Sequence, residues 1–208
     1  MFEDAQSLFA ELNNKLKEKD LSLSLICVGG FVLDYYGLRG TVDIDAFYTE
    51  TQEIKKIIYE VGERYKLNTP DELWINNSVQ NLNDAPPYDI CKTIYSFSNL
   101  KILVPPLEYI AGMKLVSGRE NDIKDVATII KYLKIKNVDT LKEKMSVFNF
   151  GDFDDAMLIE SFGLAYGLDW LKDYYVAHEK ELVSSIASNQ SNYMRNQNIT
   201  TSDKGYSR

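Results

Sequence analysis

The chain has 208 residues, of which 45% are hydrophobic and 26% are charged, and its formal net charge is −8. This length fits one domain with an appended helical part, and the composition supplies enough apolar side chains for a packed core. No stretch approaches the roughly 18 consecutive apolar residues of a membrane helix, and the acidic charge disfavours broad coating of nucleic acid.

The first half of the chain alternates between helical and strand-like patterns. Apolar residues at helical spacing indicate helices, whereas short apolar runs bounded by turn residues indicate strands. The predicted elements, in chain order, are a helix over 2–19, a strand over 21–28, a helix over 31–38, a strand over 42–48, a helix over 51–65, a loop over 66–87 with a short strand around Trp74, and strands over 88–97 and 100–104.

The pattern beyond residue 104 is helical. Pro105 and Pro106 end the last strand and favour a helix start, and the predicted helices run through Val116, over 122–134 and from 138 to about 186. We therefore predict an α+β fold: a small mixed sheet flanked by helices in residues 1–104, then a C-terminal helical bundle in residues 105–186. The polar tail, residues 187–208, is rich in Asn and Ser and is predicted to be disordered.

The most informative stretch joins the first two predicted strands. Gly29 and Gly30 end the first strand, where the missing Cβ atoms let a phosphate approach the backbone and the start of a helix favours an anion. Asp43 and Asp45 point the same way from the second strand, with Cα atoms roughly 6–7 Å apart. Two such carboxylates repel each other unless a cation lies between them, and Mg²⁺ (or Mn²⁺) held by carboxylates and substrate phosphates suits them. The stretch predicts a phosphoryl-transfer site.

These residues resemble the signature of the nucleotidyltransferase superfamily, in which Gly-Gly follows an apolar residue and Asp-x-Asp lies on the next strand. Here 12 residues separate Gly30 from Asp43. Arg39, Thr41, Asp43 and Asp45, spaced as Arg-x-Thr-x-Asp-Ile-Asp, resemble the AbiEii-like branch. That branch contains toxins of toxin–antitoxin and phage-defence systems, so the resemblance implies a defence or toxin role with a neutralising partner such as a cognate antitoxin.

A second block agrees with this resemblance. Lys114, followed by Arg119, Asp122 and Asp125, resembles the Lys…Arg…Asp-x-x-Asp helix pair of that branch. Pairing of these charges at helical spacing is the alternative, and we favour a structural role for the last three. The resemblance implies Mg²⁺ on Asp43 and Asp45, and it implies nucleotide contacts from these residues: Gly29, Gly30, Arg39, Thr41 and Lys114.

The superfamily also carries a third carboxylate on a later strand, which helps to bind the metal and deprotonates the attacking hydroxyl. Asp89, with apolar neighbours in the strand predicted over 88–97, is our candidate for this third catalytic acid. Asp84 is a weaker candidate. Absence of such an acid would favour a protein with a decayed site.

The resemblance implies Mg²⁺-dependent transfer of a nucleoside monophosphate from a nucleoside triphosphate to an acceptor hydroxyl of RNA, a protein or a small molecule. Two alternatives stay open. One is a decayed binding or antitoxin-like module. The other is a small-molecule adenylyltransferase of the antibiotic-modifying kind, which an aromatic, acid-lined acceptor pocket would indicate. Cys27 and Cys91 lie in apolar runs and favour a reduced cytoplasmic interior over a disulfide, and no membrane partner is expected.

Overall fold

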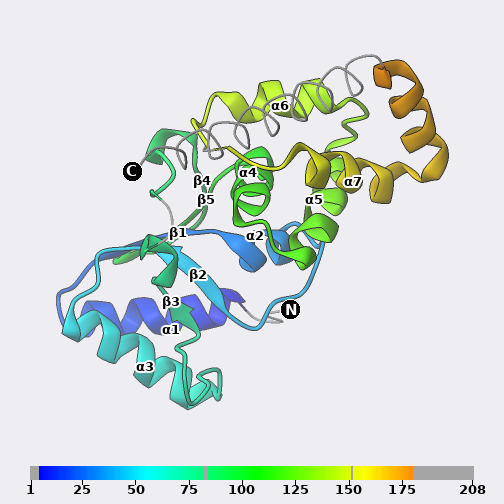
Figure 1. The fold of residues 1–208 in the computed structure, drawn as a ribbon. Helices are drawn as coiled ribbons and strands as arrows, with labels where there is room; N and C mark the ends of the chain where they lie inside the picture. The colour runs from blue at the N-terminus through cyan, green and yellow to red at the C-terminus, as the bar shows by residue number, and fades with distance from the viewer. Residues whose placement is uncertain (1–4, 82–83, 151, 180–208) are drawn as a thin grey trace, which may run out of the picture.

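The computed structural model describes residues 5–81, 84–150 and 152–179, and it has a five-stranded mixed sheet with helices on both sides (Figure 1). In chain order the elements are α1 (Ala5–Glu18), β1 (Leu23–Cys27), α2 (Gly29–Tyr35), β2 (Ile44–Phe47), α3 (Gln52–Tyr65), β3 (Ile75–Asn76), η1 (Ser78–Asn81), η2 (Tyr88–Ile90), β4 (Lys92–Ser96), β5 (Leu100–Val104), α4 (Leu107–Ser117), α5 (Glu120–Leu133), α6 (Val138–Ser146) and α7 (Asp155–Tyr166). Residues 168–179 are also helical. The predicted α+β class with a small mixed sheet is confirmed, whereas the tail over 187–208 lies outside the described residues.

Two strand directions meet inside this sheet, whose strand order is β3-β2-β1-β5-β4. β1 is antiparallel to β2 and parallel to β5; β2 is parallel to β3, and β4 is antiparallel to β5. Ile26 pairs with Phe47, and Asp45 pairs with Asn76. Because side chains alternate between the two faces of a sheet and paired residues share a face, this register shows what each face carries.

One face of the sheet, which we call the closed face, packs against α1 and α3. Leu25, Cys27 and Ile44 lie on it and are fully buried. Phe9 of α1 contacts Tyr95 of β4, with ring centroids 5.4 Å apart. The two helices contact each other and lie below the strands in Figure 1. This face contributes the main apolar core.

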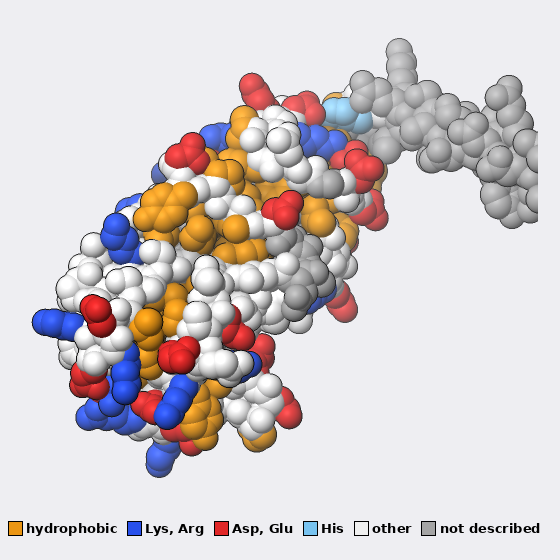
Figure 2. All heavy atoms as spheres, turned by 90° about the vertical axis from the view of Figure 1, so that its left-hand side faces the viewer, with side chains coloured by type: hydrophobic (Ala, Val, Ile, Leu, Met, Phe, Trp, Pro, Cys, Tyr) orange, Lys and Arg blue, Asp and Glu red, His pale blue; other side chains and the backbone are white. Residues whose placement is uncertain are grey.

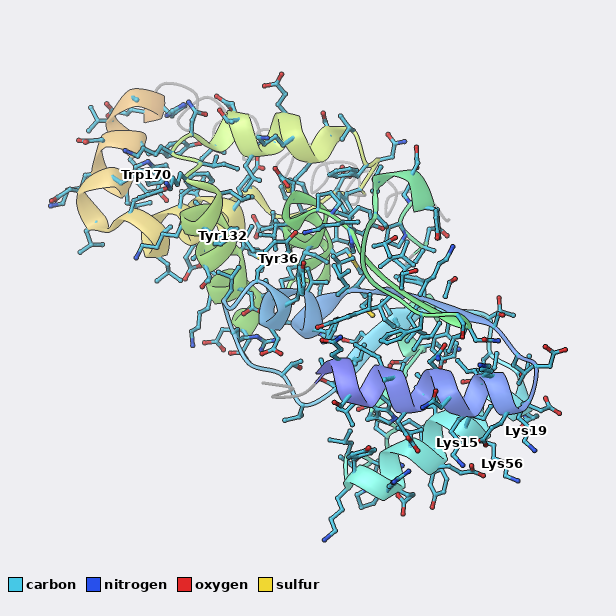
Figure 3. All side chains as sticks on the ribbon, turned by 180° about the vertical axis from the view of Figure 1, so that it is seen from behind. Lys15, Lys19, Tyr36, Lys56, Tyr132 and Trp170 are labelled. Atoms are coloured by element: carbon cyan, nitrogen blue, oxygen red, sulfur yellow. The ribbon has the colours of Figure 1, made fainter. Side chains whose placement is uncertain are left out.

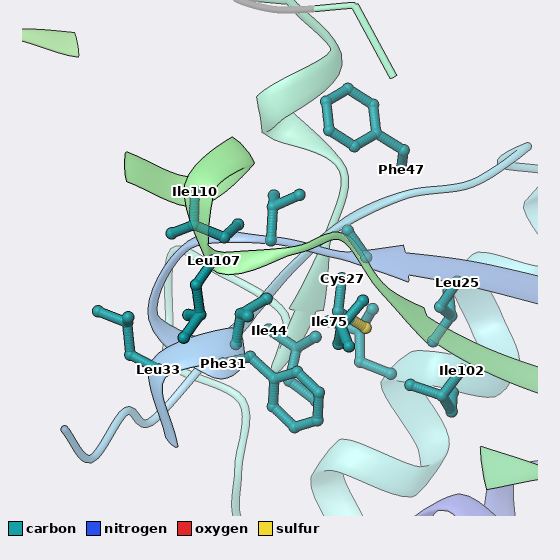
Figure 4. Close-up of a cluster of buried hydrophobic side chains, with 14 of the residues drawn as sticks. Leu25, Cys27, Phe31, Leu33, Ile44, Phe47, Ile75, Ile102, Leu107 and Ile110 are labelled. Carbon is teal, nitrogen blue, oxygen red and sulfur yellow. The ribbon is translucent and has the colours of Figure 1, made fainter. Parts of the chain in front are cut away.

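The other face, which we call the open face, carries the side chains that alternate with the buried ones. Ser24 is exposed and Ile26 is half-buried on β1, while their neighbours on the strand are buried. Figure 4 shows Phe47 across the strands from Cys27 and Ile44. Asp45 lies two residues before Phe47 and therefore points to the same open face.

A tight turn joins α4 and α5. Gly118 has a φ of 68°, a left-handed conformation that glycine adopts without strain, and its N–H donates to the carbonyl of Lys114. α5 begins directly after Arg119. The turn folds the two helices against each other, so that side chains from both can meet beside the sheet.

Three predicted strands begin later than expected, the first of them, predicted over 21–28, at Leu23. The strand predicted over 42–48 begins at Ile44, and the side chain of Val42 is 81% exposed. The strand predicted from residue 88 begins at Lys92, because the chain after Pro87 turns through η2, in which the Cys91 N–H donates to the Tyr88 carbonyl at 3.2 Å. Asp89 therefore lies on a 3₁₀ turn rather than on a strand. Among the helices that the structure describes, none combines the length and the apolar character that crossing a membrane requires.

Candidate active site

The turn between β1 and α2 lies against β2 because the Val28 N–H donates to the Asp45 carbonyl at 2.9 Å. Gly29 has a φ of 61°, and a Cβ atom at this position would lie 2.9 Å from Asp45 Oδ2. A Cβ atom on Gly30 would lie 2.8 Å from Thr41 Oγ1 and equally close to an Arg39 nitrogen. The positive φ of Gly29 favours glycine, and a side chain at either position would have to displace the side chains of the predicted site residues.

Asp43 and Asp45 lie together at the start of β2. Asp43 directly precedes the strand, and its Oδ1 accepts a hydrogen bond from Thr41 Oγ1 at 2.8 Å. Burial raises the pKa of the Asp45 carboxyl above its ordinary value, and the Asp43 carboxylate raises this pKa further. In residues 5–81, 84–150 and 152–179, no group of three or more His, Cys, Asp and Glu side chains could hold a metal ion. The site thus offers two mutually repelling carboxylates, which a divalent cation with phosphate ligands would satisfy.

Lys114 of α4 supplies a fixed positive charge. Its Nζ lies 2.8 Å from Asp122 Oδ1 and 2.6 Å from Asp125 Oδ2, and all three side chains are about nine-tenths buried. Arg39 Nε lies 3.4 Å from the other oxygen of Asp125. Lys114 and Arg119 are both close enough to Asp45 to lower the pKa of its carboxyl. The two acids of α5 therefore hold Lys114 in place while its charge still acts on the site.

Asn76 is a site residue that the sequence did not reveal. It pairs with Asp45 across the parallel β2–β3 register, and it is only 8% exposed. Its Oδ1 accepts a hydrogen bond from the Ser78 N–H at 3.2 Å, whereas its Nδ2 has no partner among the described residues. The amide is near enough to lower the pKa of Asp45, although its geometry falls short of a hydrogen bond. A two-residue strand is too short for a periodic signal, so only the pairing identifies this position.

The chain matches a family model described as a nucleotidyltransferase of unknown function (DUF6036) over residues 4–152. It belongs to this nucleotidyltransferase family. The match includes the whole sheet and α1 to α6, and it ends before α7. No curated protein and no solved structure matches the chain.

Among the residues that the structure of this nucleotidyltransferase describes, neither candidate third acid joins Asp43 and Asp45 in a group that could hold a metal ion. The catalytic role of Asp89 stays a prediction. Asp89 lies on the η2 turn that precedes β4, the edge strand of the sheet. Asp89 is exposed. Burial raises the pKa of the Cys91 thiol, and the Asp89 carboxylate raises this pKa further. Asp84 is also exposed, and its carbonyl accepts a hydrogen bond from Tyr109. The position beside Asp45 on the next strand holds the amide of Asn76 instead.

A cleft of about 740 Å³ lies on the open face next to this site. Residues from β1, from the end of β2 and from the segment after β3 line it: Ser24, Ile26, Phe47, Tyr48, Thr49, Glu50, Asn77, Gln80, Asp84, Ala85 and Tyr88. Gln80 Nε2 donates to the Tyr48 carbonyl at 2.6 Å and so ties η1 to the end of β2. The cleft volume falls within the range of about 300–1,000 Å³ that is usual for small-molecule sites.

A second cleft, of about 460 Å³, lies between α1 and α3. Its lining includes Lys15, Lys19 and Lys56, which lie together at one end of the molecule in Figure 3. Three glutamates in the same lining balance these charges. Because α1 and α3 cover the closed face, this cleft does not face Asp45.

Proposed function

We propose that this nucleotidyltransferase moves a nucleoside monophosphate from a nucleoside triphosphate to an acceptor hydroxyl at Asp43 and Asp45. The observation that carries the proposal is the contact between the glycine turn and the Asp pair, where a Cβ atom on Gly29 would meet the Asp45 carboxylate. A turn without Cβ atoms and carboxylates suited to a cation thus share one place. Lys114 and Arg119 supply positive charge to the same place.

Asp43 and Asp45 would hold Mg²⁺, with substrate phosphates and water completing its ligands. When bound, such an ion neutralises charge that develops on the phosphates during transfer. The fit rests on the donor set: Asp43 and Asp45 are both half-buried at the start of β2, where two carboxylates are unfavourable until a cation joins them. The raised pKa of Asp45 agrees with this repulsion. Thr41 orients the Asp43 carboxylate through its hydrogen bond.

The side chains of this enzyme contribute positioning and fixed charge. Gly29 and Gly30 let the β- and γ-phosphates approach the backbone, and Lys114 faces them from α4. The acceptor oxygen bonds to the α-phosphorus, the bond from that phosphorus to the bridging oxygen breaks, and pyrophosphate leaves. The hydroxyl proton passes to solvent water on the open face, because position 76 offers an amide in place of a basic carboxylate. The predicted catalytic role of Asp89 is not part of this proposal.

Incubation of the pure protein with each α-³²P-labelled nucleoside triphosphate, Mg²⁺ and a cell extract tests the proposal. The Asp43→Ala/Asp45→Ala double variant serves as the comparison. We expect label to reach an RNA, protein or small-molecule fraction with the wild type only. Transfer by neither protein would contradict the proposal and support a decayed binding module. Equal transfer by both proteins would mean that the reaction does not depend on Asp43 and Asp45.

The toxin or defence role and its neutralising partner stay predictions from the resemblance. The small-molecule alternative has an observation of its own, since the cleft beside Asp45 is lined by aromatic and acidic side chains.

A further inference from the structure

Asn76 Nδ2 is the one buried side-chain nitrogen or oxygen that has no hydrogen-bond partner in residues 5–81, 84–150 and 152–179. Figure 2 shows Lys, Arg, Asp and Glu side chains on the surface of one face of the molecule, where water can solvate them. Asn76 is instead buried, with only 8% of its surface exposed. A buried donor without a partner is costly, so such a group in a folded protein needs an explanation.

The orientation of the Asn76 amide is fixed by its neighbours. The Ile44 N–H donates to the Trp74 carbonyl at 2.8 Å, which holds the short strand β3 against β2. Oδ1 of Asn76 accepts hydrogen bonds from the Ser78 N–H at 3.2 Å and from the Ser78 hydroxyl. Because these two donors must face an oxygen, the amide nitrogen lies on the other side of the side chain. Nδ2 is therefore held in one direction without a partner there.

The acceptor beside this donor is the carboxylate of Asp45. Asp45 pairs with Asn76 across β2 and β3, so the two side chains share a face of the sheet. Gly29 follows β1, on the other side of β2, and lies against Asp45 Oδ2. Burial and Asp43 raise the pKa of Asp45, and the amide of Asn76 is near enough to lower it, although no hydrogen bond forms. Asp45 thus lies between a glycine turn and an unused donor.

The two carboxylates of the site differ in their hydrogen bonds. Thr41 Oγ1 donates to Asp43 Oδ1 at 2.8 Å and so fixes the Asp43 side chain. The corresponding donor beside Asp45 is the amide of Asn76, whose bond is not closed. The last torsion of an aspartate side chain is soft, so a small rotation of Asp45 can close it. A carboxylate that binds a cation through one oxygen can accept such a bond at the other.

We propose that Asn76 is a positioning residue of the metal site, whose Nδ2 donates to the Asp45 carboxylate when Asp43 and Asp45 bind a divalent cation. The unpartnered donor gains its acceptor only in the loaded site, so the amide stabilises that state over the metal-free one. This inference rests on the proposed function, because it requires a cation on Asp43 and Asp45. Thr41 and Asn76 then supply one donor to each carboxylate.

Two measurements on the full chain test the inference together: Mg²⁺ binding by calorimetry, and unfolding by urea without metal. Asn76→Leu keeps the shape of the side chain but removes the donor, and it should weaken Mg²⁺ binding by about tenfold or more. The urea midpoint of this variant should stay the same or rise, because the unpartnered donor is gone and water can bond to the exposed Ser78. A residue that only supports the fold would show a lower midpoint and an unchanged Mg²⁺ affinity.

Three further variants serve as comparisons. Thr41→Val also removes a donor from a metal carboxylate, but it breaks a bond that already exists, so it should lower both the Mg²⁺ affinity and the urea midpoint. Asn76→Ala removes the donor without placing a larger apolar side chain against Asp45, and it should weaken Mg²⁺ binding as Asn76→Leu does. Asn77→Ala changes the half-buried neighbour that lines the cleft, and it should alter the Mg²⁺ affinity less than about twofold.

Three results would overturn the role of Asn76. They are a Mg²⁺ affinity of Asn76→Leu within about twofold of the wild type, an equal loss of affinity in Asn77→Ala, and a lower urea midpoint of metal-free Asn76→Leu. Absence of Mg²⁺ binding by the wild type would contradict the proposed function as well. Mg²⁺ binding and nucleotide transfer by the wild type, with equal Mg²⁺ affinity in Asn76→Leu, would contradict this inference alone.

Discussion

Leu25, Cys27 and Ile44 on the closed face are fully buried, whereas Ser24 and Asp45, their direct neighbours on the same strands, face outward on the open face. The closed face meets two amphipathic helices and contributes apolar burial. The open face meets the glycine turn, the charges of α4 and α5, and a cleft. Residues that pack the core and residues that form the site thus alternate along a strand. Substitutions at adjacent positions should therefore have different consequences, for stability in one case and for activity in the other.

The largest effect on stability should follow from removing the positive charge of Lys114 beside the open face. Lys114→Ala leaves the carboxylates of Asp122 and Asp125 buried without their main cation, which should cost about 3–5 kcal/mol in the free energy of unfolding measured with urea. Adding Asp122→Asn and Asp125→Asn to this variant should restore most of the stability, because no buried charge then remains unpaired. Arg39 loses its partner Asp125, but its side chain is 47% exposed and can be solvated by water. Nucleotide affinity should stay low. Recovery of affinity together with stability would show that Lys114 has a structural role alone.

A substitution on the closed face should affect stability without removing the chemistry. Ile44→Ala opens a cavity beside Ile75 and should lower the free energy of unfolding by about 3 kcal/mol. The molecules that remain folded should transfer nucleotide at a rate within severalfold of wild type. Asp45→Ala, one residue further, should show the opposite pattern. If both variants lost stability and activity to similar extents, the two faces would not be separable.

Asn76→Asp should place a third carboxylate beside Asp45 on the open face. The metal-free protein should lose about 1–3 kcal/mol of stability, because a new charge is buried next to a like charge. Mg²⁺ affinity, measured by calorimetry, should rise about tenfold. Asn77→Asp is the control, since it adds the same charge at a half-buried neighbour that lines the cleft. Equal Mg²⁺ affinities for both variants would show that position 76 does not face the metal.

The smallest effect should be a gain of stability from Asp45→Asn. Because burial and Asp43 raise the pKa of Asp45, the folded state binds this proton more tightly than the unfolded state, and stability falls as the pH rises from about 4 through the raised value. Above the raised pKa, the charged Asp45 destabilises the metal-free fold, so the variant should be more stable than the wild type by about 1 kcal/mol or less. Thermal unfolding across this pH range measures the effect. Mg²⁺ should stabilise the wild type only; a loss of stability in the variant would contradict the account.

Local patterns in the sequence were sufficient to predict the α+β class and the mixed sheet. They did not predict the features that depend on pairing between distant segments. β3 has two residues, so Asn76 carries no periodic signal, and its role follows only from its register with Asp45. The apolar neighbours of Asp89 suggested a strand, but Pro87 precedes a 3₁₀ turn there. The partners of Lys114 lie on the next helix rather than at helical spacing, because the Gly118 turn brings the two helices together.

The most direct test of the central claim is Mg²⁺-dependent binding of a non-hydrolysable nucleoside triphosphate analogue, measured by calorimetry. Wild type and Asp43→Asn/Asp45→Asn are compared with Mg²⁺ and with a chelator. The account predicts that Mg²⁺ raises the affinity of the wild type at least about tenfold and that the double variant shows no such gain. Two results would contradict a metal site on Asp43 and Asp45. One is an equal affinity of the wild type with Mg²⁺ and with the chelator, and the other is a gain of affinity from Mg²⁺ in the double variant.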